Sequence, residues 1–103
     1  AAAVGPCIGP DSYEVGPEFP APFLAQDATN ETFFTARPQS DRLLFDLPGY
    51  VRSRLVEAGI NANMATGHDT YSDKNFFSYR RSCHQREPDY GRNLSLIVLN
   101  AED

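Results

Sequence analysis

Residues 43–60, LLFDLPGYVRSRLVEAGI, form the clearest structural pattern in this chain. Asp46 is a candidate N-cap, because its carboxylate can accept hydrogen bonds from the free amides of a first helical turn, and Pro48 suits that turn. Gly59 fits the position that follows a helix C-terminus. Apolar side chains recur at three- and four-residue steps on one face, at Leu47, Tyr50, Val51, Leu55 and Ala58. The pattern predicts an amphipathic helix that packs on a core.

Shorter apolar segments on both sides of this helix predict strands. We expect strands over residues 1–8, 76–81 and 94–99, and a weak strand or a connector over residues 60–66. Proline interrupts residues 13–26, which predict a broken or short helix, and residues 27–41 predict a loop with one helical turn. The remaining segments, 67–75 and 82–91, are polar loops. This order of elements indicates a mixed α/β fold.

Composition limits the size and the partners of the chain. It has 103 residues, 14 acidic and 9 basic, so it holds one domain at most. The acidic balance argues against binding to nucleic acid or to an anionic membrane, and no apolar run is long enough to span a bilayer. Leu, Ile, Val and Phe make up 23 residues, just above the roughly 20% below which chains tend to be disordered. We therefore expect a marginal core that gains from a partner surface.

The start of the chain adds to this expectation. The first residues, AAAVGPCI, include no initiator Met, have no basic segment typical of a signal peptide, and are apolar. We expect the sequence to be a piece of a longer polypeptide. Residues 1–8 and 94–99 should then lie in a sheet and leave unpaired edges or exposed apolar surface when no other polypeptide is present.

Cysteines and histidines give no metal-binding pattern. Cys7 lies in an apolar run and predicts a buried thiol, whereas Cys83 lies beside His84 in a polar segment, where adjacent side chains chelate poorly. His68 precedes Asp69, an arrangement more typical of a solvated turn than of an oriented base. The two cysteines do not form a disulfide framework, which favours a reducing, cytoplasmic setting.

The block FFSYRR, residues 76–81, is the most distinctive local cluster. Two aromatic residues can anchor the segment, and Arg80 and Arg81 carry planar guanidinium groups that suit phosphate or carboxylate. The same arginines can instead pair with the excess carboxylates of the chain. The residues alone leave both readings open and favour the second.

Two blocks carry a resemblance to a known family. GPCIGP at residues 5–10, leading into YEVG at 13–16, and FFSYRR at 76–81, followed by Gly91-Arg92, resemble the C-terminal half of the laccase-domain, polyphenol-oxidase-like family. Between them, Phe45-Asp46-Leu47 and the segment from Arg54 to Gly59 resemble the central helix of that family. The order and approximate spacing match along nearly the whole chain.

The resemblance implies that residues 1–103 are the C-terminal half of a single laccase-like domain, whose sheet an N-terminal half completes. It also implies a purine nucleoside phosphorylase that cleaves adenosine, inosine and methylthioadenosine with phosphate and deaminates adenosine. The intact protein would be the enzyme, and this chain alone would be inactive. Alternatives are a copper-dependent polyphenol oxidase and a non-catalytic half-domain.

The family holds one zinc ion, or copper in an older assignment, with two His and one Cys of the upstream half. The resemblance therefore places no metal ligand and no catalytic residue in this chain, and Cys7, Cys83, His68 and His84 are not assigned as ligands. The expected partners are nucleoside, phosphate and the N-terminal half.

Four residues are candidate substrate-binding groups. Arg80 and Arg81 would help to hold phosphate, and Tyr79 would bond near the site or pack beside it. Asp11 would line the pocket or, by the preferred interpretation, cap a following helix.

Three departures from the family pattern stand out. Many members have Cys-Cys at the place of Asp11-Ser12, and many have Cys-Thr near His68 or Asp69. The loop between Arg81 and Gly91 is also longer than the usual short turn.

Overall fold

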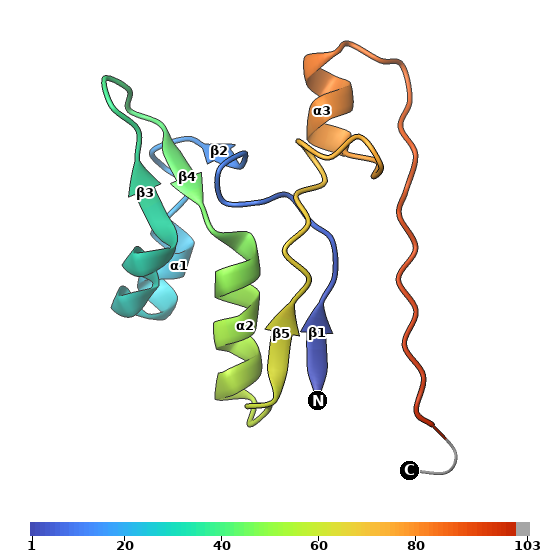
Figure 1. Cartoon of the computed structure of the whole chain (residues 1–103). Coiled ribbons are helices and arrows are strands. Elements are labelled where there is room, and N and C mark those ends of the chain that lie inside the picture. The colour runs from blue at the N-terminus through green and yellow to red at the C-terminus, as the bar shows by residue number, and fades with distance from the viewer. Residues whose placement is uncertain (101–103) are drawn as a thin grey trace.

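The computed structural model describes residues 1–100, which form two small sheets flanked by helices (Figure 1). A three-stranded antiparallel sheet has the order β2 (Glu14–Val15), β4 (Leu43–Phe45) and β3 (Phe34–Ala36). A two-stranded parallel sheet pairs β1 (Ala2–Val4) with β5 (Asn63–Ala65). The predicted mixed α/β class is confirmed.

Phe45, at the end of the central strand β4, is the centre of the core. Its side chain is 1% exposed. Five aromatic rings surround it at centroid distances of 4.8–6.0 Å, those of Tyr13, Phe19, Phe23, Phe34 and Tyr50. Aromatic pairs at such separations contribute beyond the area that they bury, so this cluster holds the three-stranded sheet to the helices.

Two short helices lie beside this core, and the first of them contributes the Phe23 ring. The predicted short helix within residues 13–26 is α1 (Ala21–Gln26), which has Pro22 in its first turn, where proline is well suited. The helical turn predicted within residues 27–41 is the 3-10 helix η1 (Ala28–Phe33). Asp27 Oδ1 caps η1 by accepting a hydrogen bond of 2.9 Å from the Thr29 amide.

The central helix α2 (Leu47–Glu57) has the predicted caps. Asp46 Oδ1 accepts a hydrogen bond of 3.0 Å from the Gly49 amide, and Gly59 follows the helix with a φ of 89°. The helix starts at Leu47, directly after the predicted cap at Asp46, and the apolar residues before the cap form β4 (Leu43–Phe45). The Phe45 amide donates to the Tyr13 carbonyl at 2.9 Å, and the Asp46 amide donates to the Phe33 carbonyl. The backbone of β4 is therefore used in the sheet before the helix begins.

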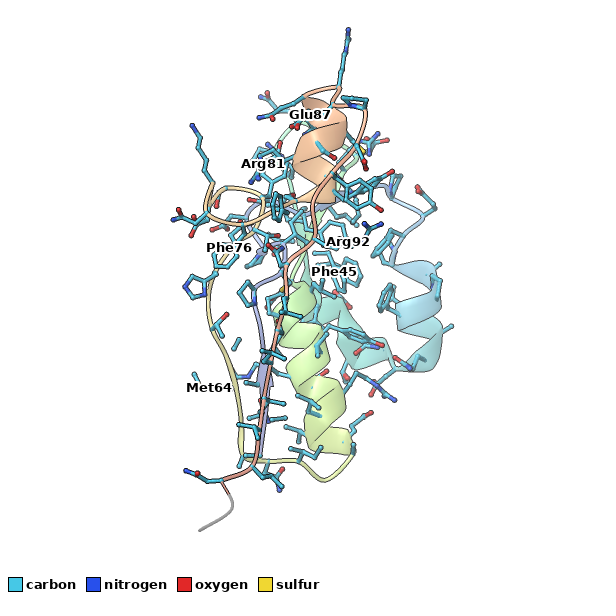
Figure 2. All side chains as sticks on the ribbon, turned by 90° about the vertical axis from the view of Figure 1, so that its right-hand side faces the viewer. Phe45, Met64, Phe76, Arg81, Glu87 and Arg92 are labelled. Carbon is cyan, nitrogen blue, oxygen red and sulfur yellow. The ribbon has the colours of Figure 1, made fainter. Side chains whose placement is uncertain are left out.

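Helix α2 packs beside the parallel pair β1–β5 (Figure 1). Arg52 Nε of α2 donates to Asn63 Oδ1 of β5 at 2.8 Å. The strands predicted over residues 1–8 and 60–66 are confirmed over shorter spans, and β1 ends at Gly5-Pro6, since proline lacks the amide that a ladder needs. Figure 2 shows Met64 at the outer side of β5, away from the core around Phe45.

The strand predicted over residues 76–81 is wrong, because α3 (Tyr79–His84) begins inside that block. Ser78 Oγ accepts a hydrogen bond of 3.2 Å from the Arg81 amide and so caps the helix. The N-cap serine, which stands directly before the helix, outweighs the strand preference of the two phenylalanines that precede it. The polar loop predicted over residues 82–91 therefore starts within the last turn of α3.

The strand predicted over residues 94–99 is wrong for the part of the chain that the structure describes. This segment runs beside β1 in the opposite direction without a strand partner, and its five large apolar side chains are 83–94% exposed (Figures 1 and 2). A groove of about 390 Å³ separates it from β1 and is lined by Ala3, Pro6, Leu94 and Ile97, among others. The expected exposed apolar surface is therefore present, and residues 2–4 lie in a sheet as expected, but residues 94–99 do not.

The described residues have a small core for their number. The radius of gyration is 15.7 Å, whereas a closed domain of this length has about 13 Å. Val15 and Phe45 are the buried hydrophobic residues within residues 1–100. Across the same residues, every helix is too short or too polar to cross a bilayer.

Candidate functional site

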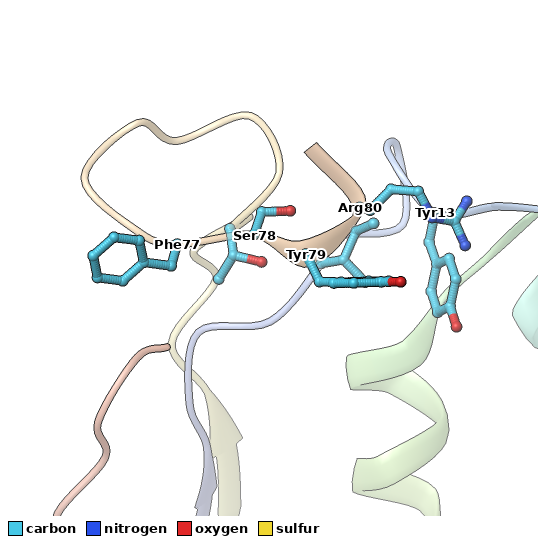
Figure 3. Close-up of a pocket in the computed structure, with 7 residues that line it drawn as sticks. Tyr13, Phe77, Ser78, Tyr79 and Arg80 are labelled. Atoms are coloured by element: carbon cyan, nitrogen blue, oxygen red, sulfur yellow. The ribbon is translucent and has the colours of Figure 1, made fainter. Parts of the chain in front are cut away.

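An open pocket of about 250 Å³ lies where the start of the chain meets the FFSYRR block (Figure 3). Its wall combines aromatic rings with polar groups, contributed by Ile8, Tyr13, Thr70, Phe77, Ser78, Tyr79 and Arg80. The cap at Ser78 fixes the direction of the first turn of α3 and so presents Tyr79 and Arg80 toward the Tyr13 turn. We call this the aromatic pocket.

Arg80 connects α3 to the three-stranded sheet. Its NH1 donates a hydrogen bond of 2.9 Å to the Glu14 carbonyl, and its guanidinium carbon lies 5.3 Å from the centre of the Tyr13 ring. These contacts hold the side chain across the wall of the pocket. Arg80 is thus a predicted site residue that the structure places in a pocket.

Tyr79 lines the aromatic pocket with a side chain that is 62% exposed. Its ring packs edge-on against the Tyr90 ring, with the centroids 4.8 Å apart. The neighbouring Cys83 side chain raises the pKa of Tyr79 above its ordinary value, through a hydrogen bond and then through charge repulsion. The Tyr79 hydroxyl is therefore engaged with the Cys83 side chain.

Arg81 lies outside the aromatic pocket and is bonded to the preceding loop. Its NH1 donates to the Thr70 carbonyl at 2.8 Å and more weakly to those of Tyr71 and Asp73, and its NH2 donates to the Phe76 carbonyl at 2.6 Å. Four backbone carbonyls thus surround one guanidinium. The structure gives Arg81 a role in holding the loop from Thr70 to Phe76, and its substrate role stays a prediction.

Asp11 does not cap a helix, so that preferred interpretation is wrong. Residues 9–13 form a turn, in which the Ser12 and Tyr13 amides both donate to the Gly9 carbonyl, and β2 follows it instead of a helix. Asp11 is exposed and lines a charged cleft that also includes Arg80. Its other predicted role, lining the substrate pocket, stays a prediction.

Asp69 is a residue that the sequence reasoning did not select for this region. Its Oδ2 accepts a hydrogen bond of 2.5 Å from the Ser12 hydroxyl, and its Oδ1 accepts one of 2.9 Å from the Tyr71 amide. Burial raises the pKa of Asp69, but the hydrogen bonds from Ser12, Gly9, Tyr71 and Ser72 outweigh it and hold the pKa below the usual value. The carboxylate therefore fastens the Gly9–Ser12 turn to the loop that leads to FFSYRR.

Arg37 and Arg42 are the other residues that the sequence reasoning missed. They stand at the ends of the turn between β3 and β4, where the Arg37 amide donates to the Arg42 carbonyl at 3.4 Å. Both guanidinium groups pair with Glu14 and line the same charged cleft as Asp11. The turn-forming residues Pro38-Gln39-Ser40-Asp41 were the available signal, since a hairpin at that point brings its two flanking arginines together.

The metal that the family resemblance implies does not fit the described residues. His68 lies against the Phe76 ring, and the His84 Nδ1 is hydrogen-bonded to the Tyr71 hydroxyl at 2.6 Å. Burial, followed by the charges of Asp69 and Asp46, raises the pKa of Cys7 and keeps its thiol protonated. Among residues 1–100, no group of three or more His, Cys, Asp and Glu side chains is placed to hold a metal ion. No chemical step is therefore derived through a metal in this chain.

The chain is thus a mixed α/β protein whose N-terminal turn and α3 together form an open pocket of aromatic residues and arginine. The family described as multi-copper polyphenol oxidoreductase laccase matches residues 1–100. The chain belongs to this family, which confirms the resemblance found in its sequence.

Relatives in this family share one functional name. A Rickettsia conorii protein named purine nucleoside phosphorylase is 40% identical to this chain over 95% of its length, and an Escherichia coli protein with the same functional name is 37% identical over 95%. The chain spans only 41% and 38% of the lengths of these two proteins.

A solved structure supports the fold. A crystal structure of a Neisseria meningitidis protein assigned to the family DUF152 aligns with 74% of this chain and 31% of its own chain, with a TM-score of 0.65 and 33% identity. The chain therefore resembles this protein in its three-dimensional fold as well as in its sequence.

Proposed function

We propose that this chain is part of a purine nucleoside phosphorylase that acts on adenosine, inosine and methylthioadenosine. The observation that carries this proposal is the family membership of residues 1–100, together with the shared name of relatives that match 95% of the chain. Because the chain spans about two fifths of those relatives, the activity is proposed for an assembly that also contains the remaining part of the domain.

The reaction sets two physical demands. An oxygen of inorganic phosphate forms a bond to C1′ of the ribose while the bond from C1′ to the base nitrogen breaks. The base leaves with the bonding electron pair and takes up a proton, so adenosine and phosphate give adenine and ribose 1-phosphate. The enzyme must therefore hold phosphate near the sugar and stabilise the departing base.

The aromatic pocket has groups suited to the base. Phe77 and Tyr79 line the pocket and are both more than half exposed, and a purine ring can stack on an exposed aromatic ring. The Tyr79 hydroxyl can donate a hydrogen bond to a purine nitrogen in place of its contact with Cys83. Arg80 supplies a fixed positive charge at the same wall. These groups support placing the purine at this pocket.

We propose that zinc, with copper as the alternative, is bound by residues outside residues 1–100, because those residues contain no suitable donor group. Such a metal supplies Lewis-acid activation of a leaving group or of water. The proposed deamination of adenosine, in which water replaces the amino group and ammonia leaves, belongs to the same larger enzyme. The free thiols of Cys7 and Cys83 agree with the cytoplasmic setting that we propose.

The apolar side chains of residues 94–99 support a second part of the proposal. We propose that the remaining part of the domain, which the family resemblance makes an N-terminal half, covers these side chains in the whole protein. Burying such a row removes apolar surface from water and stabilises both parts.

The family description favours one alternative activity, the copper-dependent oxidation of phenols. A multicopper centre needs many His and Cys ligands, and the whole sequence has two of each. The names of the relatives favour the phosphorylase. A non-catalytic half-domain is the third candidate.

A chimera tests these candidates. This chain replaces the region that it matches in the Rickettsia conorii relative, and the folded, metal-loaded chimera is incubated with adenosine and phosphate. We expect phosphate-dependent formation of adenine and ribose 1-phosphate, and inosine from deamination. Oxygen uptake with a phenol and no nucleoside cleavage would instead establish the oxidase. If the chimera folds but shows no turnover, while the unmodified relative is active in the same assay, both enzymatic proposals are wrong.

A further inference from the structure

A second pocket, which we call the charged cleft, opens beside the aromatic pocket and has a volume of about 450 Å³. Three segments that are far apart in the sequence form it: the turn at residues 11–14, the turn between β3 and β4, and α3 with the loop before it. Arg80 lines both pockets, so a ligand in the cleft lies next to a ligand in the aromatic pocket.

Arginines outnumber carboxylates in the charged cleft. Its wall carries Arg37, Arg42 and Arg80 against Asp11 and Glu14. This local excess of positive charge stands in a chain with a net charge of −5. Three guanidinium groups around one open cleft are suited to a multiply charged oxyanion, because each offers several parallel N–H donors.

The existing ion pairs engage only some of the N–H groups of these three arginines. Arg37 and Arg42 share one carboxylate, that of Glu14, and the Arg42 Nε lies 3.7 Å from Glu14 Oε1. None of the ion pairs within residues 1–100 includes Arg80, whose NH1 donates to a backbone carbonyl. Since each guanidinium has five N–H groups, most of those in the cleft remain open to a ligand.

We propose that the charged cleft is the binding site for inorganic phosphate, with Arg37, Arg42 and Arg80 as its ligands. This assignment rests on the proposed phosphorylase function, and it deepens that function by naming residues for the phosphate. The shared Arg80 wall places the phosphate next to the base pocket, as attack on the sugar between them requires.

Glu14 acts as a competitor in this arrangement. Its carboxylate occupies the donors of Arg37 and Arg42 in the free protein, and bound phosphate must take over those donors. Removing the carboxylate charge should therefore strengthen phosphate binding, whereas removing either arginine should weaken it. If these ion pairs had a purely structural role, the two kinds of substitution would not change phosphate affinity in opposite directions.

Titration calorimetry of the full 103-residue chain with inorganic phosphate at low ionic strength tests the site. We expect Arg37→Gln and Arg42→Gln each to weaken binding by roughly three- to tenfold and Glu14→Gln to tighten it by a similar factor. The side chains of Arg37 and Arg42 are 45% and 55% exposed, so neither variant should disturb folding. A thermal melt of each variant checks this.

Arg54→Gln is the matched control. Arg54 is 48% exposed and pairs with Glu57 on α2, away from the cleft. Unchanged phosphate affinity in this variant supports the site. An equal loss in Arg54→Gln, no phosphate binding to the folded chain, or weaker binding in Glu14→Gln would overturn it.

The chimera separates this inference from the proposed function. Adenosine cleavage with an unchanged KM for phosphate in Arg37→Gln and Arg42→Gln would overturn the charged cleft as the phosphate site and leave the phosphorylase standing. Arginine-dependent phosphate binding without adenosine cleavage would overturn the phosphorylase and leave the site standing. A rise in the KM for phosphate in both variants, with little change in kcat, supports both.

Discussion

Ser12 and Asp69, which are 57 positions apart in the sequence, are joined by a hydrogen bond of 2.5 Å between the Ser12 hydroxyl and Asp69 Oδ2. The contact fastens the turn before β2 to the loop before α3. Both candidate pockets lie between these two segments. The bond therefore sets the relative position of residues that the proposed chemistry needs together.

A double-mutant cycle measures this bond. Ser12→Ala and Asp69→Asn should each lower the free energy of unfolding by about 1–2 kcal/mol, and their effects should be coupled by about 1 kcal/mol. Urea denaturation gives the values. Ser72→Ala, an exposed serine of the same loop, is the control, with an expected change below about 0.5 kcal/mol. Fully additive effects would show that the contact contributes nothing.

Acid should weaken the same connection. The pKa of Asp69 lies below its usual value of 3.8, since hydrogen bonds to the carboxylate outweigh the opposing effect of burial. A carboxyl whose pKa is lower in the folded chain stabilises the fold fully above its unfolded pKa, and that contribution is lost as the pH falls through its folded pKa. The free energy of unfolding should therefore fall below about pH 4. Asp69→Asn should show a smaller fall over the same range.

Phe45 should dominate the stability of the chain. Phe45→Ala leaves a cavity among five aromatic rings and should cost about 3–5 kcal/mol, and Phe45→Leu should cost less. Since a small domain has about 5–15 kcal/mol in total, the alanine variant should lose most of its near-ultraviolet dichroism. Leu24→Ala, on an exposed part of α1, should leave it intact. Equal effects of the two alanine variants would show that the aromatic cluster is not the core.

Substitution of Arg81 should lower the stability of the fold. Arg81→Lys keeps the charge but cannot donate to four carbonyls, so it should lower the free energy of unfolding by about 1–3 kcal/mol. Arg86→Lys, an exposed position after α3, is the control. If Arg81→Lys instead weakens phosphate binding and leaves the unfolding curve unchanged, Arg81 serves substrate rather than structure.

The two thiols should differ in reactivity. Burial and two nearby carboxylates raise the pKa of Cys7, which lowers its thiolate fraction, whereas Cys83 is exposed. A thiol reagent at neutral pH should therefore modify Cys83 faster than Cys7. Cys83→Ser and Cys7→Ser assign the fast and slow phases. A faster reaction at Cys7 would contradict the burial of its thiol.

The local signals of the sequence predicted local structure well. Asp46 and Gly59 mark the ends of α2 through contacts within a few residues, and such caps are visible in a sequence. The strand predicted over residues 76–81 was wrong because the prediction rested on the two phenylalanines and did not use Ser78, whose capping role depends on the turn that follows it. Aromatic content alone does not distinguish a strand from the approach to a helix.

The candidate site was predicted only in part, for a different physical reason. Tyr79 and Arg80 were found because they stand in one distinctive block. Arg37, Arg42 and Glu14 come together only through the pairing of β4 with both β2 and β3, a long-range contact that no periodicity encodes. The strand predicted over residues 94–99 is absent from the described structure, because an apolar pattern alone does not supply the partner strand that a sheet needs.

The exposed segment LSLIVL at residues 94–99 has a practical consequence. Six residues with high strand preference, no charge and no proline are the signature of segments that stack into fibrils. The segment therefore makes self-association, rather than unfolding, the limit on the concentration of the isolated chain. Leu96→Lys would place a charge within this segment, oppose its stacking and keep the protein monomeric at higher concentration.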